Sequence, residues 1–195
     1  MKVDIFNLNK KYDIVYSDPP WQQATGGKKK ARPNSSGKPL DYPTMSLQDI
    51  KELHKNVFDN LTNKKHNVFM WTTEKFLHQT ENFMSELGYK LHIRFVWSKG
   101  RGQSPAFTVR FTHEYLLWFY KSGDIILPIK EKQGKYSSVI FASSRKHSQK
   151  PTIVYEMLES MFPNTKRIEL FARNHRENWD CWGNEAPEIE DIKGA

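Results

Sequence analysis

The chain has 195 residues, and 30 Lys and Arg against 22 Asp and Glu give a net charge of +8. This length suits one domain with a substantial core, and the positive charge favours a polyanionic partner such as nucleic acid, although solubility alone would also account for it. A single cysteine, Cys181, excludes a disulfide framework and a cysteine zinc site, and because no signal-like segment or membrane-length apolar run is present we expect a cytoplasmic protein with no membrane partner.

The first predicted element is a strand that ends at an unusual tetrapeptide. Tyr12 to Tyr16 is rich in aromatic and β-branched residues, and Asp18-Pro19-Pro20-Trp21 follows it. Ligands of open α/β sheets bind where strands end, which places Asp18 for chemistry. The Asp18 carboxylate and the Pro19 carbonyl can each accept an N–H group of an exocyclic amine, and Trp21 offers a stacking face. The tetrapeptide indicates amino-group methylation; a plain strand end, with Trp21 in the core, is the alternative.

Strands and helices alternate along the rest of the chain. Amphipathic spacing and end signals predict three helices, after Ser46 with Asp49 as a capping box, over 74–87 before Gly88, and over 151–162. Further strands are predicted over 67–72, 91–97, 114–120 and 167–171. Ser122-Gly123 predicts a hairpin from 114–120 into 125–127. The pattern predicts an α/β fold with a mostly parallel sheet, helices on its faces and an antiparallel hairpin near one edge.

Polar segments separate these elements within one predicted domain, 1–195. A basic loop over 22–40 carries four cations that can contact phosphates, unless they form an ordinary solvated loop: Lys28, Lys29, Lys30 and Arg32. Loops over 98–112 and 130–150 are expected on the substrate side, and 186–195 is an acidic tail.

Later segments carry groups suited to an anionic nucleoside ligand. Lys150 precedes a helix that begins at Pro151, where amide donors favour a carboxylate, and Asn184 with Glu185 can accept hydrogen bonds from a ribose diol. His175 follows the strand over 167–171, although a lone histidine is more often a satisfied surface group. No dinucleotide or P-loop glycine pattern is present, and no His, Asp or Glu spacing predicts a metal site.

Together, these motifs resemble the MT-A seventy family of S-adenosylmethionine-dependent N6-adenine methyltransferases. Besides the tetrapeptide, the resemblance rests on segments across nearly the whole chain, 40–45, 95–99, 112–114, 147–151, 167–173, 178–179 and 182–185. It implies a Rossmann-like class I methyltransferase sheet in permuted motif order, with the catalytic motif first and the donor-binding strand last.

The resemblance also implies roles for individual residues. Asp18 resembles the catalytic acceptor, with Pro19, Pro20 and Trp21 framing the base and Tyr42 as a second wall. The residues expected to contact S-adenosylmethionine are Asp4, Ile5, Asp18, Lys150, Phe171, Arg173, His175, Asn184 and Glu185. The residues expected to contact the nucleic acid are Trp21, Tyr42, Lys28, Lys29, Lys30, Arg32, Lys99 and Glu114.

The expected reaction is methyl transfer to the N6 amine of adenine in nucleic acid, with DNA favoured over RNA, in a bacterial or phage-infected cell. A catalytically silent nucleic-acid-binding subunit and a cytosine N4 methyltransferase are the alternatives. A homodimer or a heteromeric methyltransferase partner is also expected from the small size of the domain.

Overall fold

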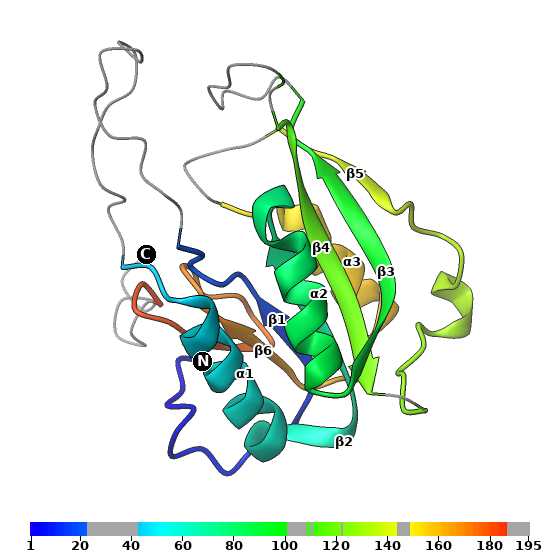
Figure 1. Cartoon of the computed structure of the whole chain (residues 1–195). Helices are drawn as coiled ribbons and strands as arrows, with labels where there is room; N and C mark the ends of the chain where they lie inside the picture. The colour runs from blue at the N-terminus through cyan, green and yellow to red at the C-terminus, as the bar shows by residue number, and fades with distance from the viewer. Residues whose placement is uncertain (23–42, 101–108, 110, 122, 144–148, 187–195) are drawn as a thin grey trace, which may run out of the picture.

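The computed structural model describes residues 1–22, 43–100, 109, 111–121, 123–143 and 149–186. One seven-stranded sheet, with the strand order β5-β3-β4-β2-β1-β6-β7, organises this part of the chain (Figure 1). The strands are β1 (Tyr12–Ser17), β2 (Thr62–Thr72), β3 (Tyr89–Ser98), β4 (His113–Lys121), β5 (Val139–Phe141), β6 (Arg167–Leu170) and β7 (Trp179–Trp182). Strand β4 is antiparallel to both of its neighbours, and the other pairs are parallel, which confirms the mostly parallel sheet.

The antiparallel component differs from the predicted hairpin. Strand β4 lies between β3 and β2 inside the sheet, and residues 125–127 form no strand. Ile126 bonds the side chain of Asn67 instead, donating its N–H to Oδ1 at 3.2 Å and accepting from Nδ2 at 2.9 Å. The Asn67 side-chain amide therefore satisfies the backbone N–H and carbonyl of Ile126, which the predicted hairpin would have paired with a neighbouring strand. The two edge strands, β5 and β7, were not predicted.

Helices cover both faces of the sheet, as predicted (Figure 1). Helix α1 (Leu47–Leu61) begins at Ser46, whose hydroxyl accepts the Asp49 N–H at 3.1 Å, and α2 (Leu77–Glu86) follows the short helix η1 (Glu74–Phe76). Both pack against one face, while α3 (Thr152–Met161) packs against the other. A further short helix, η2 (Lys130–Lys132), precedes β5. The predicted capping box and all three predicted helices are confirmed.

The strand directions bring several chain segments to one edge of the sheet. Strands β1, β2 and β6 are parallel and end at Ser17, Thr72 and Leu170. Antiparallel β4 begins at this same edge, because Tyr115 pairs with Thr72. Residues just after the three parallel strands and at the start of β4 are therefore neighbours, and we call this end of the sheet the carboxyl edge.

Candidate active site at the carboxyl edge

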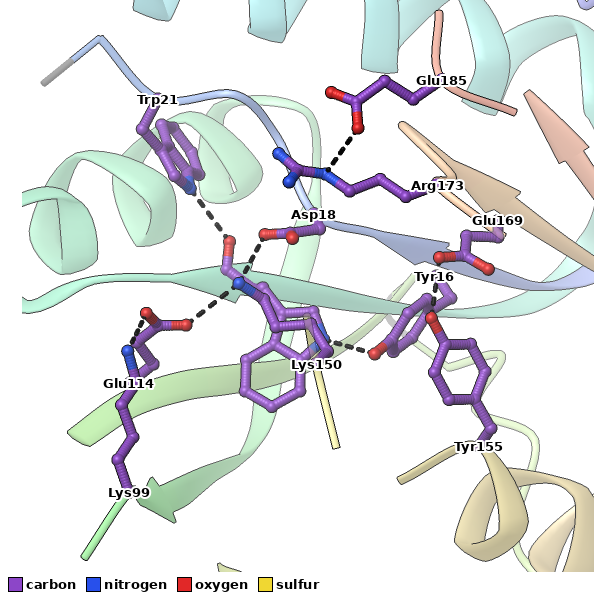
Figure 2. Close-up of polar contacts among 11 residues, drawn as sticks. Tyr16, Asp18, Trp21, Lys99, Glu114, Lys150, Tyr155, Glu169, Arg173 and Glu185 are labelled. Atoms are coloured by element: carbon purple, nitrogen blue, oxygen red, sulfur yellow. Dashed lines mark hydrogen bonds and ion pairs between the residues drawn. The ribbon is translucent and has the colours of Figure 1, made fainter. Parts of the chain in front are cut away.

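A partly buried ion network joins four segments at the carboxyl edge. The Nζ atom of Lys150, before α3, lies 2.9 Å from Oδ1 of Asp18 after β1 and 3.0 Å from Oε2 of Glu114 in β4 (Figure 2). Lys99, at the end of β3, donates to the other oxygen of Glu114. The structure thus brings together four residues that the sequence assigned to donor or substrate binding.

Burial and charge shift the pKa values within this network. Burial raises the pKa of Asp18 in spite of its ion pair with Lys150. Burial also acts to raise the pKa of Glu114, but Lys150 and Lys99 outweigh it, so that pKa lies below its ordinary value. Burial opposes the charge of Lys150, but Asp18 and Glu114 hold its pKa above the usual range. Two carboxylates with different environments therefore share one lysine.

The prolines of the tetrapeptide hold the segment after β1 in place. The Pro19 carbonyl accepts the N–H of Trp21 at 2.8 Å, and the Pro20 carbonyl accepts the N–H of Met45 at 2.9 Å. Residues 43–45, just before α1, are thereby held beside Asp18. The carbonyl that was predicted to accept a substrate amine already has one donor, and its second lone pair is the one that a substrate could use.

Trp21 has a packing role in the structure. Its side chain is 5% exposed, its ring stacks on Phe76 with centroids 5.2 Å apart, and its Nε1–H donates to the Trp71 carbonyl at 3.2 Å. This arrangement matches the alternative considered from the sequence, in which Trp21 belongs to the core, and it differs from an exposed face for stacking a base.

Trp71, at the end of β2, links the site to a buried tyrosine pair. The Trp71 indole N–H donates to the Tyr16 hydroxyl at 2.5 Å, and Lys150 Nζ lies 5.3 Å from the centroid of the Trp71 ring. Tyr16 packs against Tyr155, which donates to Glu169 at 2.8 Å. Neither Trp71 nor Tyr155 was among the predicted site residues. The position of Trp71 at a strand end was the available signal, because strand ends meet at this edge.

A cavity of about 220 Å³ lies beside Asp18. Five of the predicted donor contacts line it, Asp18, Phe171, Arg173, Asn184 and Glu185. Pro43, Met45 and Trp182 also line it and were not predicted. Arg173 Nε lies 3.6 Å from Glu185 Oε2 across the cavity wall (Figure 2). The lining combines aromatic rings, an amide and carboxylates, which suits a ligand that has an aromatic base, a diol and a cationic centre.

The segments around Ala172 and Gly183, which both border the cavity, pass close to each other. Gly183 has no room for a Cβ atom, because one would lie 2.8 Å from both the N and the O of Ala172. Phe171 adopts a positive φ of 61°, which turns the chain sharply after β6. The cleft therefore depends on a glycine and a strained turn that side-chain patterns do not reveal.

The remaining predicted contacts lie elsewhere. The Asp4 carboxylate accepts from the Asn7 side chain at 2.6 Å and from the Phe6 N–H at 3.0 Å, which lowers the pKa of Asp4, and Ile5 is buried in the core. Neither lines the cavity, although Phe6 contacts Trp182, which does. His175 lines a separate cavity near the start of β6. Tyr42, Lys28, Lys29, Lys30 and Arg32 lie outside the described residues.

Comparison with known proteins agrees with this geometry. Residues 12–185 match the MT-A70 family model. The chain belongs to the MT-A70 family. It is 30% identical to the type II methyltransferase M.MunI of Mycoplasma sp over 194 residues, which cover 92% of this chain and 79% of that protein. It is 27% identical to the N(6)-adenosine-methyltransferase catalytic subunit METTL3 of Homo sapiens over 184 residues, 90% of this chain but 28% of METTL3.

Membership of the MT-A70 family confirms the predicted resemblance, and the names of the relatives confirm the predicted enzyme class, a methyltransferase. Relative to METTL3, the chain spans less than a third of the protein that it matches. Within the described residues, no group of three or more His, Cys, Asp and Glu side chains could hold a metal ion. None of the helices described is long and apolar enough to cross a membrane.

Proposed function

We propose that this MT-A70 protein transfers a methyl group from S-adenosylmethionine to the N6 amine of adenine in nucleic acid. The observation that carries the proposal is the position of Asp18, which lines the cavity and also enters the Lys150–Glu114 network at the carboxyl edge. One carboxylate thus borders both a nucleoside-sized site and a charged site.

Asp18 is suited to orient an amine. Its Oδ1 atom is held by Lys150 at 2.9 Å, and a carboxylate has a second oxygen whose lone pairs can accept an N–H group. An adenine amine is a weak nucleophile because its lone pair is delocalised into the ring. Acceptors at Asp18 and Pro19 favour a nitrogen whose lone pair points at the methyl group, and after transfer the extra proton passes to water.

The residues of the cavity would hold the methyl donor. S-adenosylmethionine supplies an electrophilic methyl group on a sulfonium. Asn184 and Glu185 suit its ribose diol, and Phe171 with Trp182 suits its apolar parts. Lys150 already bonds two carboxylates with two of its N–H groups, and we propose that the third contacts the donor carboxylate.

We favour DNA over RNA as the carrier of the adenine, and the cytoplasm of a bacterial or phage-infected cell as the setting. The support for this choice is that the chain spans 79% of the type II methyltransferase M.MunI but only 28% of METTL3. A homodimer or a heteromeric partner completes the proposal, since a relative is named as the catalytic subunit of an assembly.

The test is incubation with labelled donor and separate DNA and RNA pools, followed by mass spectrometry of the digested product. Methyladenine in DNA is the expected result, and methylcytosine would favour the alternative amino-methyltransferase. Asp18→Ala should abolish transfer and retain part of the donor binding measured by calorimetry. Substantial turnover by Asp18→Ala would contradict the assignment. A wild-type protein that binds nucleic acid but not donor would be the silent subunit.

A further inference from the structure

A group of lysines lies at the end of the sheet opposite Asp18. Strands β1, β2 and β6 begin there, and the lysines stand just before or just inside these strands. They are Lys10, Lys11, Lys64, Lys65 and Lys166. Because β1 pairs in parallel with both β2 and β6, the three strand starts are adjacent, and we call this surface the amino edge.

A bulge in β2 presents two of these lysines. Tyr12 pairs with Thr62 but Ile14 pairs with Asn67, so β2 has three more residues than β1 over this stretch. Hydrogen bonds hold the bulge. The Asn63 amide donates to Asp13 at 2.7 Å, and the His66 ring contacts the Asn63 carbonyl at 2.6 Å.

The bulge directs charge to solvent. Lys64 and Lys65 are exposed, and in the described part of the chain neither has an ion-pair partner. A bulge that is held by its own hydrogen bonds and carries unpaired charge is typical of a functional feature.

The amino edge continues into a cavity of about 1060 Å³, lined in part by Lys10, Lys166 and Arg167. Arg167 is 6% exposed and donates through one terminal nitrogen to the carbonyls of Phe162 and Pro163. Its Nε atom has no partner among the described residues. Burial lowers the pKa of Arg167. Arg167 therefore adds positive charge beneath the wall of this cavity, which favours an anion there.

The carboxylates near the amino edge are mostly occupied. Asp180 accepts from Lys10 and from the Tyr12 hydroxyl, and Glu159 is held by Arg176 through two bonds of 2.6 and 2.7 Å. Asp13 accepts from Asn63 and from the backbone N–H of Lys166.

Glu177, which is exposed, is the remaining acid of the cavity wall. It lines the cavity together with Lys10, Lys166 and Arg167, so the basic side chains of this wall outnumber it.

We propose that the amino edge binds the phosphate backbone of a nucleic acid strand, as a contact surface separate from the carboxyl edge. This rests on the proposed function for the choice of a polynucleotide. A six-residue strand spans about 20 Å, so the lysines lie too far from Asp18 to touch the reacting nucleotide. They contact phosphates that flank it, which adds affinity without reading sequence.

The test compares two triple variants of the full chain. The first, Lys64→Gln with Lys65→Gln and Lys166→Gln, removes three charges from the amino edge, and the second removes three from elsewhere, Lys51→Gln with Lys55→Gln and Lys135→Gln. Fluorescence anisotropy with a labelled DNA strand over a range of salt gives the slope of log affinity against log salt. The first variant should lower the size of that slope by about two to three, and the control should leave it unchanged.

Two further readouts separate this inference from the proposed function. The first variant should retain wild-type donor binding and the wild-type kcat at saturating DNA, because no altered residue lies at the carboxyl edge. Absence of methyl transfer by the wild type would contradict the proposed function and leave the binding result intact. An unchanged slope in the first variant overturns the inference. The inference is also overturned if the first variant loses binding to inorganic phosphate but keeps wild-type binding to DNA, because that result would indicate a small phosphate ligand.

Discussion

Lys150 Nζ lies 2.9 Å from Oδ1 of Asp18, so the proposed catalytic carboxylate is one of two partly buried acids on a single lysine. This relationship gives Lys150 a structural task besides any contact with the donor. Its charge opposes the effect of burial on the pKa of both Asp18 and Glu114, and its ion pair fixes the orientation of the Asp18 carboxylate.

Lys150→Met should destabilise the protein by about 3–5 kcal/mol at neutral pH and abolish transfer, because it leaves two buried carboxylates without their shared cation. Without the lysine, both carboxylates have pKa values above those of the unfolded chain. The deficit relative to the wild type should therefore shrink as the pH falls and the acids become protonated. Urea unfolding at neutral and mildly acidic pH measures this.

The matched control for Lys150 is the double variant Lys150→Met with Glu114→Gln. Removing one of the two acids should recover part of the lost stability but none of the activity. If Lys150→Met is as stable as the wild type at neutral pH, the network does not hold Asp18 as described.

Trp21→Ala should cost about 3–5 kcal/mol of stability, because Trp21 is 5% exposed and stacked on Phe76. Trp21→Phe keeps an aromatic ring against Phe76 but loses part of the buried ring volume and the hydrogen bond to the Trp71 carbonyl, so it should cost about 1–3 kcal/mol, less than Trp21→Ala. Thermal unfolding and the KM for nucleic acid separate the two roles of Trp21. A stable Trp21→Ala variant with a raised KM would instead support base stacking.

The sequence predicts the helices and strands that have regular apolar spacing or a clear end signal. The helix after Ser46 has apolar spacing and a cap, and the strand before Asp18 has a clear end signal, so both were found. Strand β5 has only three residues, with Val139 and Phe141 exposed, and so carries no buried pattern. Short edge strands depend on a partner strand rather than on their own residues.

The site residues also fall into those that the sequence predicts and those that it does not. Asp18, Lys150 and Glu114 stand in motifs, and the structure brings them together. Trp71 was missed because its contribution is a backbone carbonyl, an indole N–H and a ring face, each aimed by packing. Contacts of this kind arise from the tertiary arrangement, and no local sequence pattern encodes them.

Gly183→Ala should impair donor binding and stability together. The Cβ of an alanine at this position would lie 2.8 Å from the backbone of Ala172, so one wall of the proposed donor cavity must move, at a cost of about 1–3 kcal/mol. Gly134→Ala is the control, because Gly134 has a φ of 68° but open space around it, and strain of about 1 kcal/mol is the only expected cost. Calorimetry with the donor should show weaker binding for Gly183→Ala alone. Equal donor affinity in the two variants would show that the cavity tolerates the displacement.

Glu169→Gln should change how stability depends on pH. Burial raises the pKa of Glu169 from 4.5 to about 7, with the charge of Asp18 adding to the shift, while the Tyr155 hydrogen bond and Arg176 oppose it. Because the folded state holds this proton more tightly than the unfolded state, the stabilisation is complete below about pH 4.5 and is lost as the pH rises toward 7. A shift of this size corresponds to roughly 3 kcal/mol.

Glutamine keeps an acceptor for the Tyr155 hydroxyl and has no charge to bury. The Gln variant should therefore match the wild type at mildly acidic pH and exceed its stability above neutral pH, when unfolding by urea is followed across that range. Glu156→Gln, at an exposed position on α3, should show no such crossover. A Glu169→Gln variant that is equally destabilised at every pH would mean that the carboxylate is needed in its ionised form. Glu169 would then belong with Asp18 among the charged groups of the site.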